Sequence, residues 1–253
     1  MSNVASTAIH TLLDTACRPY QAAGKFAWHF ARGKLGRDPV FKGMLQHGLL
    51  PHRDAGIRVL DIGCGQGLLS SWLLSAQAQY EQGAWPADWP APPAIAQIHG
   101  MELMPRDVER ARAALSHHAS SASRTSFEIA DMCTAGFPAS DAVVILDVLH
   151  YVDFPAQDNV LHRVHGCLAD DGVLLLRVGD AAGGWPFRIS NWVDNVVTTI
   201  RGHRTLPTFC RSITDWQHAI TDIGFSVQAM PMHHGTPFAN ILLICKKHRK
   251  EST

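Results

Sequence analysis

The stretch VLDIGCGQGLLS, Val59 to Ser70, carries three glycines at alternate positions, Gly63, Gly65 and Gly67. The apolar run IRVLDI before them predicts a short buried strand, and the run after them has helical spacing. Glycine allows positive φ and lacks the Cβ that would keep another group away from the backbone. A strand, a glycine turn and a helix N-terminus together therefore predict a place where a ligand approaches the main chain closely.

Four carboxylates accompany the apolar runs of the chain. Asp61 lies within the run before the glycines, and Glu102, Asp131 and Asp147 come at or near the ends of three later runs. In an open α/β sheet a ligand binds at the carboxyl ends of the strands, where the strand order reverses. We therefore expect all four carboxylates to point toward one crevice.

The glycine spacing in VLDIGCGQG is G-x-G-x-G, with an acid in the preceding strand. A dinucleotide-binding fold would instead show G-x-G-x-x-G and an acidic residue about twenty positions later. Together with the later landmarks IHGMEL, FEIADM, AVVILDVLHYV and LADDGVLLLRVGD, this segment resembles motif I and the following motifs of the class I S-adenosylmethionine (SAM)-dependent methyltransferases. The resemblance covers roughly residues 55–180 and continues through the last two apolar runs.

The resemblance implies SAM as the cofactor and a set of residues that bind it. Bare main chain at the glycines would let the methionine part and the ribose lie close, and Asp61 would orient the loop or reach the SAM amino group through water. Glu102 would accept hydrogen bonds from both ribose hydroxyls, and Asp131 would accept one from the adenine amine. A turn or helix-cap role for Asp131 and structural capping by Asp147 stay open as alternatives. The implied cofactor-binding residues are Asp61, Gly63, Gly65, Gly67, Glu102, Leu103, Asp131, Met132 and Asp147.

His150 and Tyr151, in DVLHYVD after the fourth predicted strand, are candidate catalytic residues on the acceptor side. The methyl group of a sulfonium is already electrophilic, so the protein mainly supplies alignment and a dry pocket. A general base is needed only if the acceptor must lose a proton. His150, with an ordinary pKa of about 6.5, suits a phenol or an activated carbon, and packing under the following helix is the alternative. Asp180, after the fifth strand, is a second candidate base.

Aromatic side chains outside the predicted sheet indicate the acceptor. In small-molecule members of this family the N-terminal helices and the segment after the fifth strand cover it, and aromatic walls suit a flat or extended apolar molecule. The segment GKFAWHFARGKLGRDPVF also resembles the N-terminus of methyltransferases encoded beside bacterial aryl-polyene and xanthomonadin-type pigment genes. That resemblance implies O- or C-methylation of an aromatic head group or of a carrier-bound acyl precursor. The candidate wall residues, for which core packing is the alternative, are Tyr20, Phe26, Trp28, His29, Phe30, Trp185, Phe187 and Trp192.

These residues need a sheet and helices to position them. Strands alternating with helices predict parallel pairing, and the short connection between the last two strands predicts an antiparallel pair. The fold expected is a doubly wound, seven-stranded, mostly parallel Rossmann-like sheet with an antiparallel last strand. We expect an N-terminal helical cap at 1–50 and a SAM-binding domain at 51–253 with an insertion at 180–211. A Pro- and Trp-rich stretch at 79–94 predicts an extended surface insertion. The predicted strands are 57–62, 95–102, 125–130, 142–147, 172–178, 225–232 and 239–247, and the predicted helices are 67–78, 105–118, 155–168 and 213–222.

The composition excludes several classes of partner. Lys plus Arg (22) equals Asp plus Glu (22), which disfavours a large nucleic-acid surface. The six cysteines are scattered singly and the fifteen histidines lack the carboxylate or thiolate company that a metal needs, so we expect no metal site. No apolar run reaches the roughly 18–20 residues that cross a bilayer, and the stretch MSNVASTAIHTLL lacks the basic start and long apolar stretch expected of a signal peptide. We expect a cytoplasmic protein that acts on a small-molecule or carrier-bound acceptor, and a homodimer is compatible with the sequence.

Two other functions use the same landmarks. A non-catalytic SAM-fold binding or assembly protein would not need the intact glycine pattern with Asp61 and Glu102. An RNA or protein methyltransferase of the amine-modifying type would show a proline pair after the fourth strand, where this chain has DVLHYV. A deep, covered pocket favours a small acceptor, and an open basic groove favours a polymer.

Overall fold

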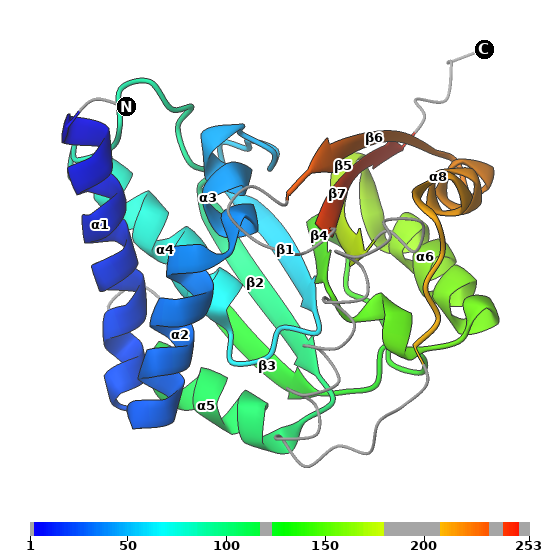
Figure 1. Ribbon diagram of the computed structural model, residues 1–253, viewed down its shortest axis with the longest axis horizontal. Coiled ribbons are helices and arrows are strands. Elements are labelled where there is room, and N and C mark those ends of the chain that lie inside the picture. The colour runs from blue at the N-terminus through cyan, green and yellow to red at the C-terminus, as the bar shows by residue number, and fades with distance from the viewer. Residues whose placement is uncertain (1–2, 117–122, 180–207, 233–239, 248–253) are drawn as a thin grey trace.

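The computed structural model describes residues 3–116, 123–179, 208–232 and 240–247. Its centre is a seven-stranded sheet in the order β3-β2-β1-β4-β5-β7-β6, drawn in Figure 1. Neighbouring strands run parallel except at β7, which is antiparallel to both β5 and β6. The prediction of a doubly wound, mostly parallel sheet with an antiparallel last strand is therefore confirmed. The strands are β1 (Ile57–Ile62), β2 (Ile95–Glu102), β3 (Thr125–Ile129), β4 (Ser140–Leu146), β5 (Leu168–Gly179), β6 (Phe225–Pro231) and β7 (Asn240–Lys247).

Helices cover the sheet from two sides, with α1, α2, α4 and α5 grouped away from α6 and α8 (Figure 1). Because side chains alternate along a strand, the two sides have separate buried clusters. Val59, Val144 and Leu175 lie with α1 to α5, whereas Leu60 and Leu174 lie with α6 and α8. The helices are α1 (Asn3–Cys17), η1 (Arg18–Gln21), α2 (Lys25–Arg37), α3 (Pro39–Gln46), α4 (Leu68–Glu81), α5 (Pro105–Ser116), η2 (Leu149–Tyr151), α6 (Phe154–Cys167) and α8 (Ile213–Asp222).

The N-terminal helices pack directly on the body of the sheet domain. The Ser71 hydroxyl donates to the Ala16 carbonyl (2.7 Å) and the Trp72 indole donates to the Phe41 carbonyl (2.8 Å). Leu12, on α1, belongs to the same buried cluster as these contacts. Residues 3–46 are thus a structural layer of the sheet, and the domain division at residue 50 stays a prediction.

Helix starts differ in a way that bears on ligand binding. Asp38 accepts from Val40 N–H (3.1 Å) at the start of α3, and Asp153 accepts from Ala156 N–H (3.0 Å) at the start of α6. In contrast, α4 begins after Gly67 with no side-chain cap. The first N–H groups of α4 therefore remain available to a ligand.

The segment 79–94 differs from its prediction as an extended surface insertion. Helix α4 continues to Glu81, and Trp89 is only 7% exposed. The Trp85 and Trp89 rings meet edge to face at 5.7 Å, and the Trp85 indole donates to the Pro90 carbonyl. The prediction was right that 82–94 forms no helix or strand, and it was wrong about 79–81, which are helical, and about Trp89, which is buried in the main hydrophobic cluster.

Strand β5 and the segment 180–211 can also be compared with what the sequence predicts. Strand β5 begins at Leu168, earlier than predicted, because Leu168 is buried and pairs with Ser140, and a register shift separates this pair from the next, Ala142 with Val173. The insertion predicted at 180–211 lies outside the described residues as far as residue 207. Among the described helices, none has both the length and the apolarity needed to cross a membrane.

Candidate active site

The glycine loop, Gly63 to Gly67, joins β1 to α4 and is tied to β2. The N–H groups of Gly63 and Cys64 both donate to the Met101 carbonyl, at 2.8 and 3.0 Å. A Cβ at Gly63 would lie 2.5 Å from a methyl of Val148, so the loop can pass this point only as glycine. The loop is therefore packed closely on its neighbours at its first residue.

Gly65, in the middle of the glycine loop, is not closely packed as Gly63 is. Its φ is +52°, and no other heavy atom lies within 4 Å of where its Cβ would be. The backbone at Gly65 is thus bare and faces open space, and the uncapped start of α4 follows immediately. This is the close approach to main chain that the glycine spacing predicted.

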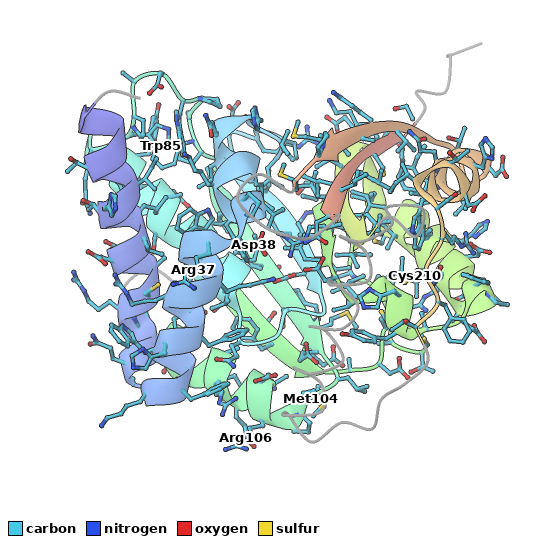
Figure 2. All side chains as sticks on the ribbon, in the orientation of Figure 1. Arg37, Asp38, Trp85, Met104, Arg106 and Cys210 are labelled. Atoms are coloured by element: carbon cyan, nitrogen blue, oxygen red, sulfur yellow. The ribbon has the colours of Figure 1, made fainter. Side chains whose placement is uncertain are left out.

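The Glu102 carboxylate lies against the glycine loop. One oxygen accepts from Gly65 N–H and the other from Met104 N–H, each at 3.0 Å. Each carboxylate oxygen has capacity for a second hydrogen bond. Glu102 can therefore hold the loop and still accept from two hydroxyls of a ligand. Figure 2 labels Met104, which precedes α5 beyond the end of β2.

Asp61 is a buried carboxylate whose charge has no hydrogen-bonding partner. It is 4% exposed, and no donor among the described residues bonds its side chain. Burial, with a smaller contribution from the charge of Glu102, raises the pKa of Asp61 to about 7. A cation bound beside Asp61 would remove this penalty, so the position suits a positively charged group.

A contact from the N-terminal helices supports the glycine loop, and the sequence had not indicated it. The hydroxyl of Tyr20, a fully buried residue in η1, donates to the Gln66 carbonyl (3.0 Å). The Gln66 amide in turn donates to Asp107 (3.1 Å). Tyr20 therefore supports the loop instead of lining an acceptor pocket, and no local spacing pairs it with a residue so far along the chain.

Apolar side chains remain exposed beside Glu102. Leu103 is 62% exposed and Ile129, at the end of β3, is 47% exposed. Ile129 pairs with Glu102 across the two strands, and sequence reasoning had missed it. Met132 is half-buried, and Asp131 accepts from Cys133 N–H (2.8 Å), which is the turn that had stayed open as its alternative role. These residues offer an apolar rim to a flat ring.

Asp147 belongs to a cluster of four charges at the ends of β4 and β5, which we call the ion cluster: Lys34, Asp38, Asp147 and Arg177. Arg177 Nε donates to Asp147 (2.8 Å), and its two terminal nitrogens donate to Asp147 and Asp38. Lys34 Nζ lies 2.8 Å from Asp38 and 3.6 Å from Asp147. The nearby cations hold the pKa of Asp147 below its usual range although burial opposes this. Both Asp147 oxygens are thus engaged within the protein, unlike those of Asp61.

His150 and Tyr151 lie in the turn η2, directly after Asp147. Their rings are 4.2 Å apart between centroids. The turn is held from outside, since Phe209 N–H donates to the His150 carbonyl and Gln157 donates to the Phe209 carbonyl, both at 2.8 Å. Burial lowers the pKa of His150 from its ordinary value, and the charge of Asp147 opposes part of that shift. His150 is therefore neutral at pH 7 and able to accept a proton.

Several residues that the sequence analysis proposed for the site are not part of the contacts described above. Asp180, Trp185, Phe187 and Trp192 lie outside the described residues. Phe26 is 54% exposed and stacks on Phe30, with the Arg110 guanidinium 4.8 Å from its centroid. The described residues hold no group of three or more side chains suited to a metal ion.

The assembled site brings together groups of complementary kinds. Bare main chain at Gly65, a carboxylate at Asp61 that pairs with no described residue, and a two-oxygen acceptor at Glu102 lie at the carboxyl ends of β1 and β2. Apolar atoms of Leu103 and Ile129 lie next to Glu102. This set fits a ligand with a cationic group, neighbouring hydroxyls and a flat ring. SAM has all of these features, so the residues present fit that cofactor.

Comparisons with known proteins agree with this geometry. A family model described as a methyltransferase domain matches residues 28–229. No curated protein is similar enough in sequence to match the chain. Among solved structures, the pyocyanin biosynthetic protein PhzM is 16% identical with a TM-score of 0.59, over 87% of this chain and 57% of its own. An O-methyltransferase family 2 protein from Planctomyces limnophilus, in complex with apigenin, is 14% identical with a TM-score of 0.59, over 87% of this chain and 61% of its own.

A shorter structural relative matches along almost its whole length. Magnesium protoporphyrin IX methyltransferase (ChlM) from Synechocystis, solved with SAM, is 17% identical with a TM-score of 0.56, over 98% of this chain and 99% of its own. By contrast, the chain spans less than two thirds of the length of PhzM and of the Planctomyces protein. At these identities the likeness concerns the fold.

Proposed function

The chain belongs to a family of methyltransferase domains, and from that premise we propose that it methylates a small aromatic or carrier-bound acyl acceptor at oxygen or carbon. SAM is the methyl donor that the family uses. The observation that carries the proposal is that two features occur in one site. The Asp61 carboxylate has no hydrogen-bond partner among the described residues, and the main chain at Gly65 is bare. We propose a role in secondary-metabolite biosynthesis, of which pigment formation is one form.

Each cofactor-binding residue has a proposed task that its contacts support. Asp61 faces the positive amino end of the cofactor, and Glu102 accepts from the ribose hydroxyls while it keeps Gly65 in place. Asp131 accepts from the adenine amine with its second oxygen, and Met132 and Leu103 contact the ring. Asp147 takes an indirect part, because its oxygens already bind Arg177. Bound SAM would supply an electrophilic methyl group.

The protein's part in the reaction is alignment and movement of a proton. An acceptor hydroxyl or activated carbon would lose its proton as its new bond to the methyl carbon replaces the bond between that carbon and sulfur, whose electron pair stays on sulfur, and His150 would take the proton. Its lowered pKa keeps the ring neutral and ready to do so at physiological pH. Tyr151, in contact with the His150 ring, would orient it, and Asp180 is the second candidate base.

Aromatic acceptors are favoured by the site's surroundings and by the relatives. Phe26 and Phe30 leave aromatic surface on α2, and two of the similar structures are named for pyocyanin biosynthesis and for a complex with apigenin. We also propose a cytoplasmic location, because the six cysteines are scattered singly along the sequence, a usage typical of proteins in reducing compartments.

Two measurements test the proposal in sequence. Isothermal titration of the purified chain with S-adenosylhomocysteine should give saturable binding, and Gly65→Val should abolish it because the valine side chain fills the space beside the bare backbone. The chain is then incubated with SAM labelled in its methyl group and a panel of hydroxylated aromatics, and the products are examined by mass spectrometry. Transfer of the label to an aromatic, absent with Gly65→Val, is expected. A folded wild-type chain that does not bind S-adenosylhomocysteine would refute the assignment.

A further inference from the structure

The ion cluster is built around a guanidinium that has no access to water. Arg177 has a side-chain exposure of 0% and sits in the apolar run of β5, on the side of the sheet that carries α1 to α5. An isolated charge at such a position would be costly, so Arg177 depends on both of its carboxylate partners. The two acids and two bases balance one another in charge. The cluster is therefore complete without a ligand.

Arg177 holds Asp147 by its side chain and by its main chain. The guanidinium binds both Asp147 oxygens, and the Arg177 carbonyl accepts from Asp147 N–H (3.3 Å). Asp147 has φ +59°, the one non-glycine residue with positive φ in the described part of the chain. Such a conformation persists only where the surroundings hold it, and it often occurs at functional sites. Here the three bonds from Arg177 hold it.

The left-handed backbone conformation of Asp147 determines where the next residues lie. Val148 packs into the space that a Cβ at Gly63 would need, so it contacts the start of the glycine loop. His150 follows one turn later in η2. A displacement of Asp147 would therefore move both the neighbour of the cofactor loop and the proposed base.

The other half of the ion cluster comes from the N-terminal helices. Asp38 lies at the corner between α2 and α3, in front of the sheet in Figure 2. It caps α3 through Val40 N–H and also accepts from Arg177, which is 139 positions away in sequence. Lys34, one turn earlier on α2, approaches both acids. Arg177 thus joins the helical layer to the turn that carries His150.

We propose that Arg177 is a positioning residue for methyl transfer, which it serves by clamping Asp147 and Asp38 together so that the turn 147–151 keeps its place beside the glycine loop. The inference rests on the proposed function, since it assigns Arg177 to the same site. It does not assign Arg177 a contact with cofactor or acceptor.

Arg177→Lys is the main test variant. Lysine keeps the charge but is a single ammonium that cannot reproduce the bidentate fork and the bond to Asp38 at once. Arg53→Lys is the matched control, because Arg53 makes a bidentate pair with Asp171 at the opposite end of the sheet. Asp38→Asn is the second variant, since its amide oxygen can still cap α3 while the charge facing Arg177 is lost.

Three readouts separate positioning from stability. Hydrogen exchange of the amides at 147–151 should become faster in Arg177→Lys and Asp38→Asn but remain unchanged in Arg53→Lys. Affinity for S-adenosylhomocysteine should change by less than about threefold, because the glycine loop keeps its own bonds to the Met101 carbonyl and to Glu102 when Val148 moves. With the acceptor identified as above, kcat should fall at least about tenfold in Arg177→Lys while KM for SAM stays within about threefold.

Each outcome decides the proposal. If hydrogen exchange of the amides at 147–151 and kcat in Arg177→Lys both equal those of the Arg53→Lys control, the proposal is overturned. A kcat that falls only in proportion to the unfolded fraction, measured by thermal unfolding, would also overturn it. If the wild-type chain binds no S-adenosylhomocysteine, the proposed function fails by itself, and the exchange experiment still decides whether Arg177 holds the turn. If Arg177→Lys does not fold, the same three measurements are made on Asp38→Asn.

Discussion

Two groups of carboxylates lie at the carboxyl ends of the same sheet and differ in how their charge is balanced. Asp61 and Glu102, at the ends of β1 and β2, form no ion pair with a cation among the residues that the structure describes, and the pKa of Asp61 is raised to about 7. Asp38 and Asp147, near the ends of β4 and β5, are bound by Arg177 and Lys34, and their pKa values are lowered. One group is incomplete without a ligand, and the other is complete.

This difference separates ligand binding from support within one site. A buried carboxylate without a partner costs stability, and a protein keeps such a group where a bound cation repays that cost. A buried guanidinium between two carboxylates does not need a ligand and fixes the backbone around it. The pair of Asp61 and Glu102 is therefore expected to respond to the cofactor, and the ion cluster is expected to respond to changes in folding.

The largest effect should come from removing the cation of the ion cluster. Arg177→Met leaves Lys34 as the one remaining counter-charge that the described residues offer Asp38 and Asp147, and breaking a buried pair in this way costs about 3–5 kcal/mol. Urea unfolding should show this loss in the free energy of unfolding. Arg53→Met, which breaks the exposed pair with Asp171, should cost less than about 1 kcal/mol. Equal losses in the two variants would contradict the distinction between a buried and an exposed pair.

Removing an acid from the other group should affect binding more than folding. Glu102→Ala deletes the acceptor for two hydroxyls and frees the N–H groups of Gly65 and Met104. Charged hydrogen bonds are worth about 1.5–3 kcal/mol each, so affinity for S-adenosylhomocysteine should fall by at least about 100-fold in calorimetry. Glu102→Gln, which keeps one acceptor oxygen, should lose less. Wild-type affinity in Glu102→Ala would remove Glu102 from the cofactor site.

Replacing the proposed base should leave the pair of Asp61 and Glu102 intact. His150→Ala should keep its affinity for S-adenosylhomocysteine and lower turnover by about 100-fold, as expected for loss of a general base. Since burial lowers the pKa of His150, wild-type turnover should fall only when the pH drops below the ordinary value of about 6.5. The pH profile of kcat checks this, and an unaltered rate in His150→Ala would exclude the role.

The smallest effect concerns the unpaired acid itself and depends on pH. An acid whose folded pKa is raised binds a proton that the unfolded chain releases, so its contribution to stability is lost as pH rises from about 4 to about 7. Asp61→Asn should therefore stabilise the apo chain at about pH 8 and have less effect at about pH 5. Its affinity for S-adenosylhomocysteine should fall by about tenfold. Denaturation at both pH values measures the first effect, and an equal shift at both would contradict it.

Much of the fold could be predicted from local patterns. The expected strands 57–62 and 95–102 and the helix 213–222 match β1, β2 and α8 at both ends. Apolar runs of strand length and helical spacing are properties of neighbouring residues, so they can be read without tertiary structure. The prediction for 79–94 missed the end of α4 and the burial of Trp89, because a content of Pro and Trp indicates a loop and does not indicate which indole packs into the core.

The sequence by itself determined the strand, the glycine loop and the following helix, together with the order of acids along the chain, because each depends on a few adjacent residues. Only the tertiary structure decided which acids stay unpaired. Arg177 and Asp38 are 139 positions apart, and a lone charge in the run LLLRVG signals that a partner exists without saying which one. Electrostatic balance depends on distance in space, and that distance is set by how the helices pack on the sheet.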